Sequence, residues 1–116
     1  MVRKIDRGSV VLADDPYKDH DSGGRPFLII SDESYPFYPN GYLGVPLTKR
    51  KKSNTYEFLD YDKEEVYEEF EHSRNFVNPY SPVQVNEPGR VLCKLDDSFV
   101  NLMADKVNKA LGFVMK

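Results

Sequence analysis

Cysteine is nearly absent from this sequence of 116 residues, in which Cys93 is the only one. A single thiol excludes an internal disulfide and any cysteine-based zinc site, and such scarcity is typical of a reducing compartment. Cys93 stands among Val91, Leu92 and Leu95, where a thiol usually serves as a small apolar core residue. We therefore do not expect it to act as a nucleophile.

Long hydrophobic runs are also missing. The first apolar run, Val10 to Ala13, is far too short for a signal peptide or a membrane span. The chain has only two histidines, and the sequence contains no cluster of metal-binding residues. These absences predict a cytoplasmic protein without a membrane partner, a metal ion or another cofactor.

The negative charge of the chain is concentrated in one segment. Residues 60–71 hold seven acidic residues and one lysine, a net charge of -6, whereas the whole chain carries -3, so the remainder carries +3. A length of 116 residues with 40% hydrophobic residues suits one soluble domain with one core. We predict a single domain over 1–116, with a basic body and an acidic segment, 60–72, that we interpret as an insertion or a divergent loop.

Short apolar runs separated by turn residues predict a mainly β fold. The expected strands, including a bent or edge strand that Pro79 and Pro82 interrupt, are 10–12, 27–31, 42–47, 55–59, 76–85 and 90–94. Within the acidic segment, Val66 and Phe70 are four residues apart, which favours a short helix over an irregular loop.

Only the carboxy-terminal segment shows a long helical period. Apolar residues recur at intervals of three and four from Ser98 to about Leu111, and we expect Gly112 to end this helix. Five or six short strands and one terminal helix fit a small SH3-like barrel. A parallel sheet would need helices between its strands.

An arginine stands where a polar loop turns into an apolar strand. Gly23 and Gly24 give the backbone unusual freedom, and Pro26 rejects a helix, so Arg25 is expected at a rigid strand entrance. Its planar guanidinium suits a phosphate, which suggests a phosphodiester site. The alternative is an arginine that merely solvates the rim of the strand.

Four consecutive cations, residues 49–52, directly follow Thr48 at the end of an expected strand. Their position beside Thr48 argues against a merely solvated hairpin tip, and four adjacent cations attract an anionic backbone. Three aromatic residues, Tyr35, Phe37 and Tyr38, lie in the preceding connection. They are suited to stack unpaired bases, although packing in the core or in a dimer is the alternative for at least one of them.

Several short segments occur in a distinctive order along the chain. They are Gly8 to Leu12 with Asp14 to Pro16, Gly24-Arg25-Pro26 with a strand ending at Ser31, Val45-Pro46-Leu47-Thr48, Phe76 to Pro79 with Val83 and Val85, and Leu111-Gly112-Phe113. In order and spacing they resemble the MazF/PemK toxin family. The resemblance covers most of the chain outside the acidic segment.

The resemblance implies a CcdB/PemK-like barrel that forms a homodimer. It also implies a metal-independent endoribonuclease that cuts single-stranded RNA at short specific sequences and is neutralised by a cognate antitoxin. Arg25 and Thr48 take the positions of the family's catalytic arginine and threonine.

Cleavage of RNA by its own 2′-hydroxyl requires a base, a partner for the phosphorane and an acid for the leaving oxygen. Arg25 suits the phosphorane and Thr48 a nonbridging oxygen. His20 is a candidate base, because histidine has a suitable unperturbed pKa and His20 lies in the loop leading to Arg25, with Asp14, Asp19 and Asp21 as alternatives. Family members often carry a glutamate in this loop, so the sequence departs from the family there and the base stays unassigned. The residues expected to bind RNA are Ser22, Gly24, Tyr35, Lys49, Arg50, Lys51 and Lys52.

Two other readings of the sequence remain open. One is a CcdB-like toxin that keeps the barrel but poisons gyrase. The other is a non-catalytic nucleic-acid-binding barrel in which the acidic segment mimics RNA and covers the basic face. In that second case, neutralising the acids would raise RNA affinity and steepen its salt dependence.

Overall fold

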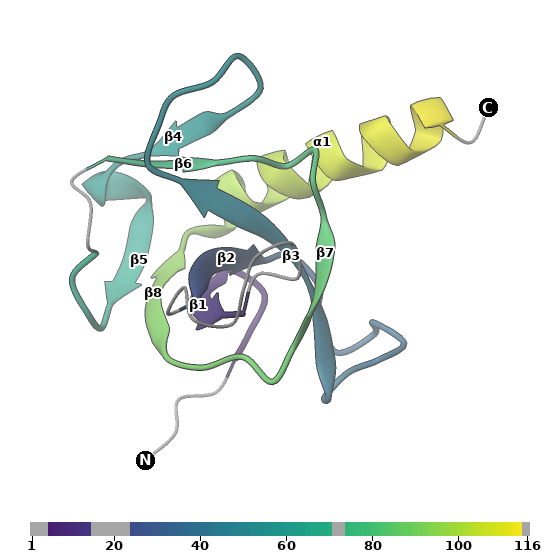
Figure 1. Ribbon diagram of the computed structural model, residues 1–116, viewed down its shortest axis with the longest axis horizontal. Helices are drawn as coiled ribbons and strands as arrows, with labels where there is room; N and C mark the ends of the chain where they lie inside the picture. Colours follow the sequence, from purple (N-terminus) through teal and green to yellow (C-terminus); the bar gives the residue numbers. More distant parts are fainter. Residues whose placement is uncertain (1–4, 15–23, 71–73, 115–116) are drawn as a thin grey trace.

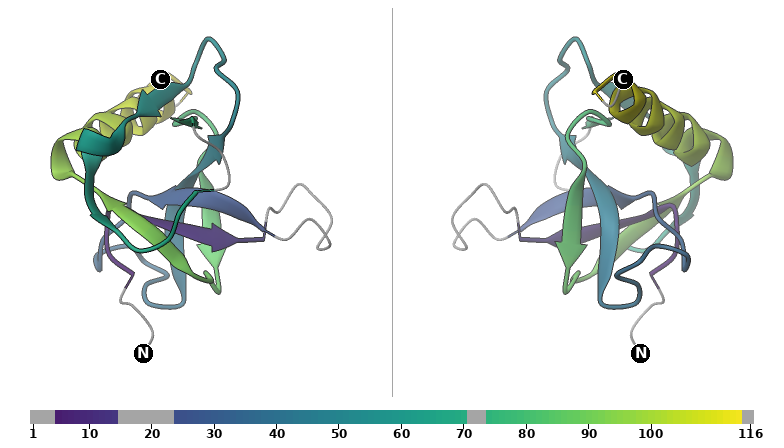
Figure 2. Two further views of the ribbon diagram at one scale, coloured as in Figure 1. Left: turned by 90° about the vertical axis from the view of Figure 1, so that its left-hand side faces the viewer. Right: turned by 90° about the vertical axis from the view of Figure 1, so that its right-hand side faces the viewer.

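The computed structural model describes residues 5–14, 24–70 and 74–114, with the backbone alone for 112–114. In these residues an antiparallel sheet curls into a half-barrel, and one carboxy-terminal helix lies over one side of it (Figures 1 and 2). The elements are β1 (Ser9–Ala13), β2 (Arg25–Ile29), β3 (Gly41–Thr48), β4 (Tyr56–Phe58), the 3₁₀ turn η2 (Asp60–Asp62), β5 (Lys63–Val66), β6 (Asn75–Val77), β7 (Val83–Asn86), β8 (Val91–Leu95) and α1 (Asp97–Val114). This architecture confirms the predicted mainly β barrel with a terminal helix.

The longest strand, β3, organises the sheet. The strand order is β4-β6-β3-β2-β1-β8-β5, and β7 pairs with β3 outside that path. The first half of β3 pairs with β7, up to Gly44 opposite Val83, and its end pairs with β6, where Leu47 lies opposite Val77. Because β3 changes partners along its length, the sheet bends there and curls on itself.

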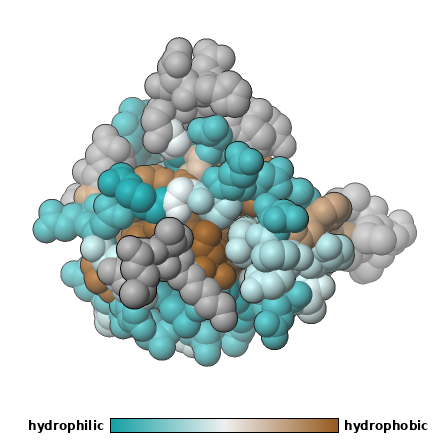
Figure 3. All heavy atoms as spheres, turned by 90° about the horizontal axis from the view of Figure 1, so that it is seen from below, coloured by the Kyte–Doolittle hydropathy of each residue, from teal (hydrophilic) through white to brown (hydrophobic). Residues whose placement is uncertain are grey.

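Alternation along the central strands divides the apolar residues between two faces. Val10, Leu28 and Val45 lie opposite one another on β1, β2 and β3, and they belong to the cluster that packs against Met103 of α1. Their neighbours in sequence, such as Phe27, point to the other face and form a second cluster. The surface seen from below is mostly hydrophilic, with a small apolar area near its centre (Figure 3).

The helix predicted in the acidic segment is wrong, because this segment forms η2 and then β5. Lys63 and Val66 of β5 lie opposite Leu95 and Cys93 of β8. Backbone pairing with β8 outweighs the local preference of this segment for a helix. The four-residue spacing of Val66 and Phe70 therefore does not reflect a helix. Phe70 lies beyond the strand, where its ring packs 5.7 Å from that of Phe58.

Some acids of this segment form local ion pairs. Glu68 forms an ion pair with Arg90 at 3.0 Å, and Glu64 approaches Lys94 of β8 at 3.9 Å. Both pairs join the segment to β8 and the residue before it rather than to the basic run 49–52. The acidic segment therefore works as part of the sheet.

The predicted strand 76–85 is two strands, β6 and β7, because the residues around Pro79 and Pro82 leave the sheet and the two strands pair with different parts of β3. The remaining predicted strands are present within about two residues of the expected bounds. The predicted end of the helix is wrong, because α1 continues to Val114 and Gly112 lies within it. A glycine inside a helix costs only about 1 kcal/mol relative to alanine, which is too little to stop a helix by itself. Among the described residues, no helix is long and apolar enough to span a membrane.

Replacing Asp96 by alanine is expected to cost about 1 kcal/mol of unfolding free energy, because Asp96 caps α1. Its Oδ1 accepts hydrogen bonds from the backbone N–H of Phe99 and from the hydroxyl of Ser98, both at 2.9 Å. The bond from the Phe99 N–H lowers the pKa of Asp96, so its contribution is present above the unfolded-state pKa and is lost as pH falls through the folded-state pKa. Urea denaturation at pH 7 and pH 3 measures both effects, and Asp96→Asn, which keeps the acceptor, should lose less. Equal stability of wild type and Asp96→Ala at pH 7 would contradict the cap.

Cys93 is expected to resist alkylation by iodoacetamide at pH 8 in the folded protein and to react in denaturant. The side chain is fully buried between β1 and β5, and burial raises the pKa of its thiol from 9.0 to about 12. Because the folded-state pKa lies above the unfolded value, this contribution to stability is complete below about pH 8.5 and declines as pH rises towards 12. Mass spectrometry measures the rate of alkylation in the folded and in the denatured protein. Equal rates would show that Cys93 is not buried.

Candidate active site

The ends of two neighbouring strands bring Arg25 and Thr48 together. Strands β2 and β3 pair with Phe27 opposite Pro46 and Leu28 opposite Val45. Continuing this register by two residues sets Arg25, the first residue of β2, opposite Thr48, the last of β3. Opposed residues in an antiparallel pair share a face, with Cβ atoms about 5 Å apart. That face is the one away from α1.

A hydrogen bond fixes the guanidinium of Arg25 beside β3. Its Nε donates to the carbonyl of Leu47 at 3.0 Å, next to Thr48 in the chain. The hydroxyl oxygen of Thr48 accepts a long bond, 3.4 Å, from the backbone N–H of Arg50. A hydroxyl that accepts in this way still has its own proton to donate, so Thr48 can donate to a phosphate oxygen. Both side chains are half-buried, which limits their motion without removing them from solvent.

Gly24 controls how the chain enters β2. Its φ is +89°, and a Cβ there would lie 3.3 Å from the carbonyl oxygen of Ala13. Only glycine takes this conformation at little cost, and the next residue, Arg25, pairs directly with Ala13 of β1. A role of Gly24 in binding RNA remains a prediction.

Three of the four candidate bases lie outside the described residues. His20 and Ser22 lie outside them, as do Asp19 and Asp21. Asp14 is described and exposed, one residue beyond the pair of Ala13 with Arg25. Among the described residues, no group of three or more histidine, cysteine or acidic side chains is arranged to hold a metal ion.

The basic run adjoins the Arg25 and Thr48 pair. It forms the loop between β3 and β4, and its four side chains are exposed: Lys49, Arg50, Lys51 and Lys52. Thr55 closes this loop, because its hydroxyl oxygen accepts from the backbone N–H of Lys52 at 2.9 Å. The cations are therefore held near the end of β3 that carries Thr48.

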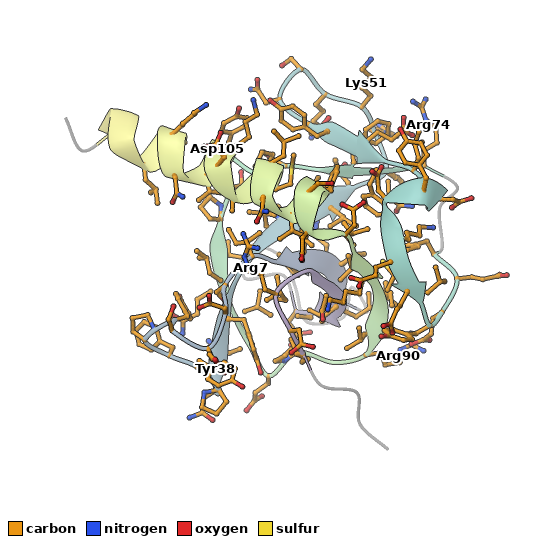
Figure 4. All side chains as sticks on the ribbon, turned by 180° about the vertical axis from the view of Figure 1, so that it is seen from behind. Arg7, Tyr38, Lys51, Arg74, Arg90 and Asp105 are labelled. Atoms are coloured by element: carbon orange, nitrogen blue, oxygen red, sulfur yellow. The ribbon has the colours of Figure 1, made fainter. Side chains whose placement is uncertain are left out.

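The aromatic residues of the connection before β3 lie at the other end of that strand. Figure 4 shows Tyr38 far from Lys51, and the eight residues of β3 span roughly 23 Å. The hydroxyl of Tyr35 donates to Gln84 at 3.3 Å, while the ring of Tyr38 packs edge-on against Tyr42 at 5.9 Å. Tyr38 thus takes the packing role, and the structure does not bring Tyr35 to the Arg25 and Thr48 pair within one chain.

The sequence reasoning missed a second arginine on the same face. Thr48 lies opposite Phe76 of β6, and Phe76 lies opposite Glu57 of β4. Arg74 forms a two-pronged ion pair with Glu57, Nε to Oε2 at 2.9 Å and Nη2 to Oε1 at 3.0 Å, and its Cζ lies over the ring of Phe76. The hydrogen bonds from Arg74 lower the pKa of Glu57. The sequence shows the two-residue spacing that puts Arg74 and Phe76 on one face of a strand. It does not show that both residues lie beside Glu57, which is distant in sequence.

Solved structures share this fold along nearly the whole chain. An endoribonuclease in complex with its cognate antitoxin, from a mycobacterial species, is 19% identical with a TM-score of 0.70, covering 94% of this chain and 96% of that chain. An endoribonuclease from a mycobacterial species is 18% identical with a TM-score of 0.68, covering 96% and 94%. MazF from Deinococcus radiodurans is 20% identical with a TM-score of 0.63, covering 93% and 96%.

No family model matches the sequence, and no curated protein matches it. The structural likeness, at 18 to 20% identity, establishes the fold. The chain has the fold of the MazF toxins, as its resemblance to the MazF/PemK family predicted.

Proposed function

We propose that this protein is a MazF-type endoribonuclease toxin that cuts single-stranded RNA at specific sequences without a metal ion. The observation that carries the proposal is the hydrogen bond from the Arg25 Nε to the carbonyl of Leu47, which holds the guanidinium beside Thr48, where both side chains are only half-buried. The fold supports it, because the similar solved structures include proteins named as endoribonucleases and MazF.

The proposed reaction is attack of a ribose 2′-hydroxyl on the adjacent phosphorus. The bond from phosphorus to the 5′-oxygen breaks, leaving a 2′,3′-cyclic phosphate and a 5′-hydroxyl. Arg25 stabilises the crowded phosphorane with charge-assisted hydrogen bonds, and Thr48 donates to a nonbridging oxygen. The base that takes the 2′-hydroxyl proton is one of His20, Asp14, Asp19 or Asp21, and a protonated group must supply a proton to the leaving 5′-oxygen.

The proposed substrate track starts from the basic run. Exposed cations in the loop after Thr48 attract the RNA backbone. We further propose that Ser22 and Gly24 contact RNA at the entrance of β2, and that Tyr35 contributes only where a longer RNA or a second subunit reaches the far end of β3. A homodimer, a cognate antitoxin and a cytoplasmic location complete the proposal, and one of the similar structures is an endoribonuclease bound to its antitoxin.

Incubation of the purified protein with mixed-sequence single-stranded RNA in EDTA tests the proposal. Cleavage at a short recurring sequence, with cyclic phosphate ends, is the expected result, and it should disappear in Arg25→Ala and in Thr48→Ala. Intact RNA together with inhibition of gyrase supercoiling would contradict the proposal and support the CcdB-like alternative. RNA that is bound but never cut would favour a non-catalytic barrel.

A further inference from the structure

Arg74 lies close to the proposed reaction centre. Phe76 is on the strand next to Thr48, so the two backbones are separated by about 4.8 Å. Arg74 stands two residues along the chain from Phe76, roughly 6.6 Å, and on the same face. A nucleotide whose phosphate meets Arg25 and Thr48 could therefore direct its own base or the adjacent one towards Arg74.

The contacts of Arg74 decide which part of it faces a ligand. Two guanidinium nitrogens, Nε and Nη2, are engaged by the carboxylate of Glu57. The Cζ of Arg74 lies over the ring of Phe76, 5.0 Å from its centroid. The side chain is nevertheless 61% exposed. Glu57 engages one edge of the Arg74 guanidinium, and Phe76 covers one of its sides. The side turned away from Phe76 is therefore the part of the guanidinium that mainly faces solvent.

Such a plane suits an unpaired base better than a phosphate. Single-stranded RNA is commonly held by stacking of bases on aromatic rings or on the plane of an arginine. A phosphate prefers the edge of the guanidinium, where it would compete with Glu57. An acidic peptide would meet the same competition, so the geometry favours RNA as the ligand.

The surroundings of Arg74 also suit a base. A surface hollow of about 420 Å³ lies beside it at the β4 edge, reaches the start of α1, and is lined by Lys51, Thr55, Tyr56, Glu57, Tyr61, Asp62, Arg74, Phe76, Phe99 and Leu102. Lys51 and Arg74 point outwards at the same end of the molecule (Figure 4). The carboxylates of Glu57 and Asp62 can accept hydrogen bonds from the amino groups of a base.

We propose that Arg74, held by Glu57 and Phe76, is a stacking platform for one unpaired base next to the cleaved phosphodiester, and so contributes to sequence specificity. This inference rests on the proposed function for its substrate. Arg74 acts here as a binding residue, whereas Arg25 and Thr48 carry the chemistry.

Fluorescence of 2-aminopurine tests the platform directly. The probes are short RNAs of the cleaved sequence, or oligouridine if no cleavage is found, each with 2-aminopurine at one position. They are bound to the Thr48→Ala protein, which leaves them uncut. We expect quenching at one position beside the scissile bond, and its loss when Arg74→Lys is added, which keeps the charge but removes the plane. Affinity for the unlabelled RNA should fall about tenfold.

Matched variants and an abasic probe separate stacking from other roles. Arg90→Lys is the control, because Arg90 is also an exposed, ion-paired arginine and lies away from Arg74 (Figure 4). Glu57→Gln should weaken the quenching partly, because it loosens the plane. An RNA with an abasic nucleotide at the quenched position has no base to stack, so proteins with and without Arg74→Lys should bind it with equal affinity.

Three results would overturn the platform: quenching unchanged in Arg74→Lys, an affinity loss that persists with the abasic RNA, or the same losses in Arg90→Lys. These outcomes are independent of catalysis. If the wild type cuts RNA and Arg74→Lys behaves like it, the platform fails and the proposed function stands. If the wild type never cuts RNA but the position-specific quenching depends on Arg74, the platform stands and the ribonuclease fails.

Discussion

Arg25→Ala is expected to lower the rate of RNA cleavage by a factor of about 100 to 1,000, the usual cost of removing one donor that faces developing negative charge. The variant loses the guanidinium that the Leu47 carbonyl holds beside Thr48. Single-turnover cleavage of a labelled RNA, with enzyme in excess, measures the effect on the chemical step.

Two further variants and a folding control accompany this prediction. Arg25→Lys should also be strongly impaired, because an ammonium lacks the planar fork that fits a phosphate. Arg90→Ala, which removes an exposed arginine in an ion pair with Glu68, should cut RNA like the wild type. Circular dichroism should show folded protein in all cases. An Arg25→Ala protein that keeps more than about a tenth of the wild-type rate would remove Arg25 from the reaction centre.

Met103→Ala should lower the free energy of unfolding by about 2 to 5 kcal/mol, the range for truncating a buried methionine. Met103 is fully buried in the cluster that joins α1 to the sheet. Its removal leaves a cavity between the two layers, and equilibrium denaturation in urea measures the loss.

The neighbouring residue gives the control for this second prediction. Leu102 precedes Met103 in α1 but is 45% exposed, so Leu102→Ala should cost clearly less. Equal losses in the two variants would mean that α1 does not pack on the sheet through the face described. Met103 lies on the α1 side of the sheet, whereas Arg25 and Thr48 face away from it, so cleavage by folded Met103→Ala protein should be retained.

The sequence predicted most of the fold because most elements carry strong local signals. Apolar runs bounded by turn residues marked β1, β2, β3 and β8, and the helical period marked α1. Strand β5 in the acidic segment was not predicted, because it is defined by pairing with β8, a partner distant in sequence. Local propensity is weak in such a case, and tertiary contacts decide.

The candidate site was predictable only in part, for a related reason. Arg25 and Thr48 stood at strand ends, which drew attention to them, but their meeting depends on a register that no local pattern shows. The same limit hid the contact of Arg74 with Glu57. Tyr35 shows the same limit, since its sequence position before β3 does not reveal that its hydroxyl contacts Gln84, which pairs with Leu43 rather than with Thr48.

Strand β5 also affects how separate molecules meet. It is the last strand in the sheet order, so one of its sides has no neighbouring strand among the described residues. Glu64 and Glu65 are exposed along it. Two copies approaching through this border would bring four carboxylates together, and their mutual repulsion opposes strand addition. The acidic segment therefore discourages aggregation, a benefit that a neutral strand at the same border would lack.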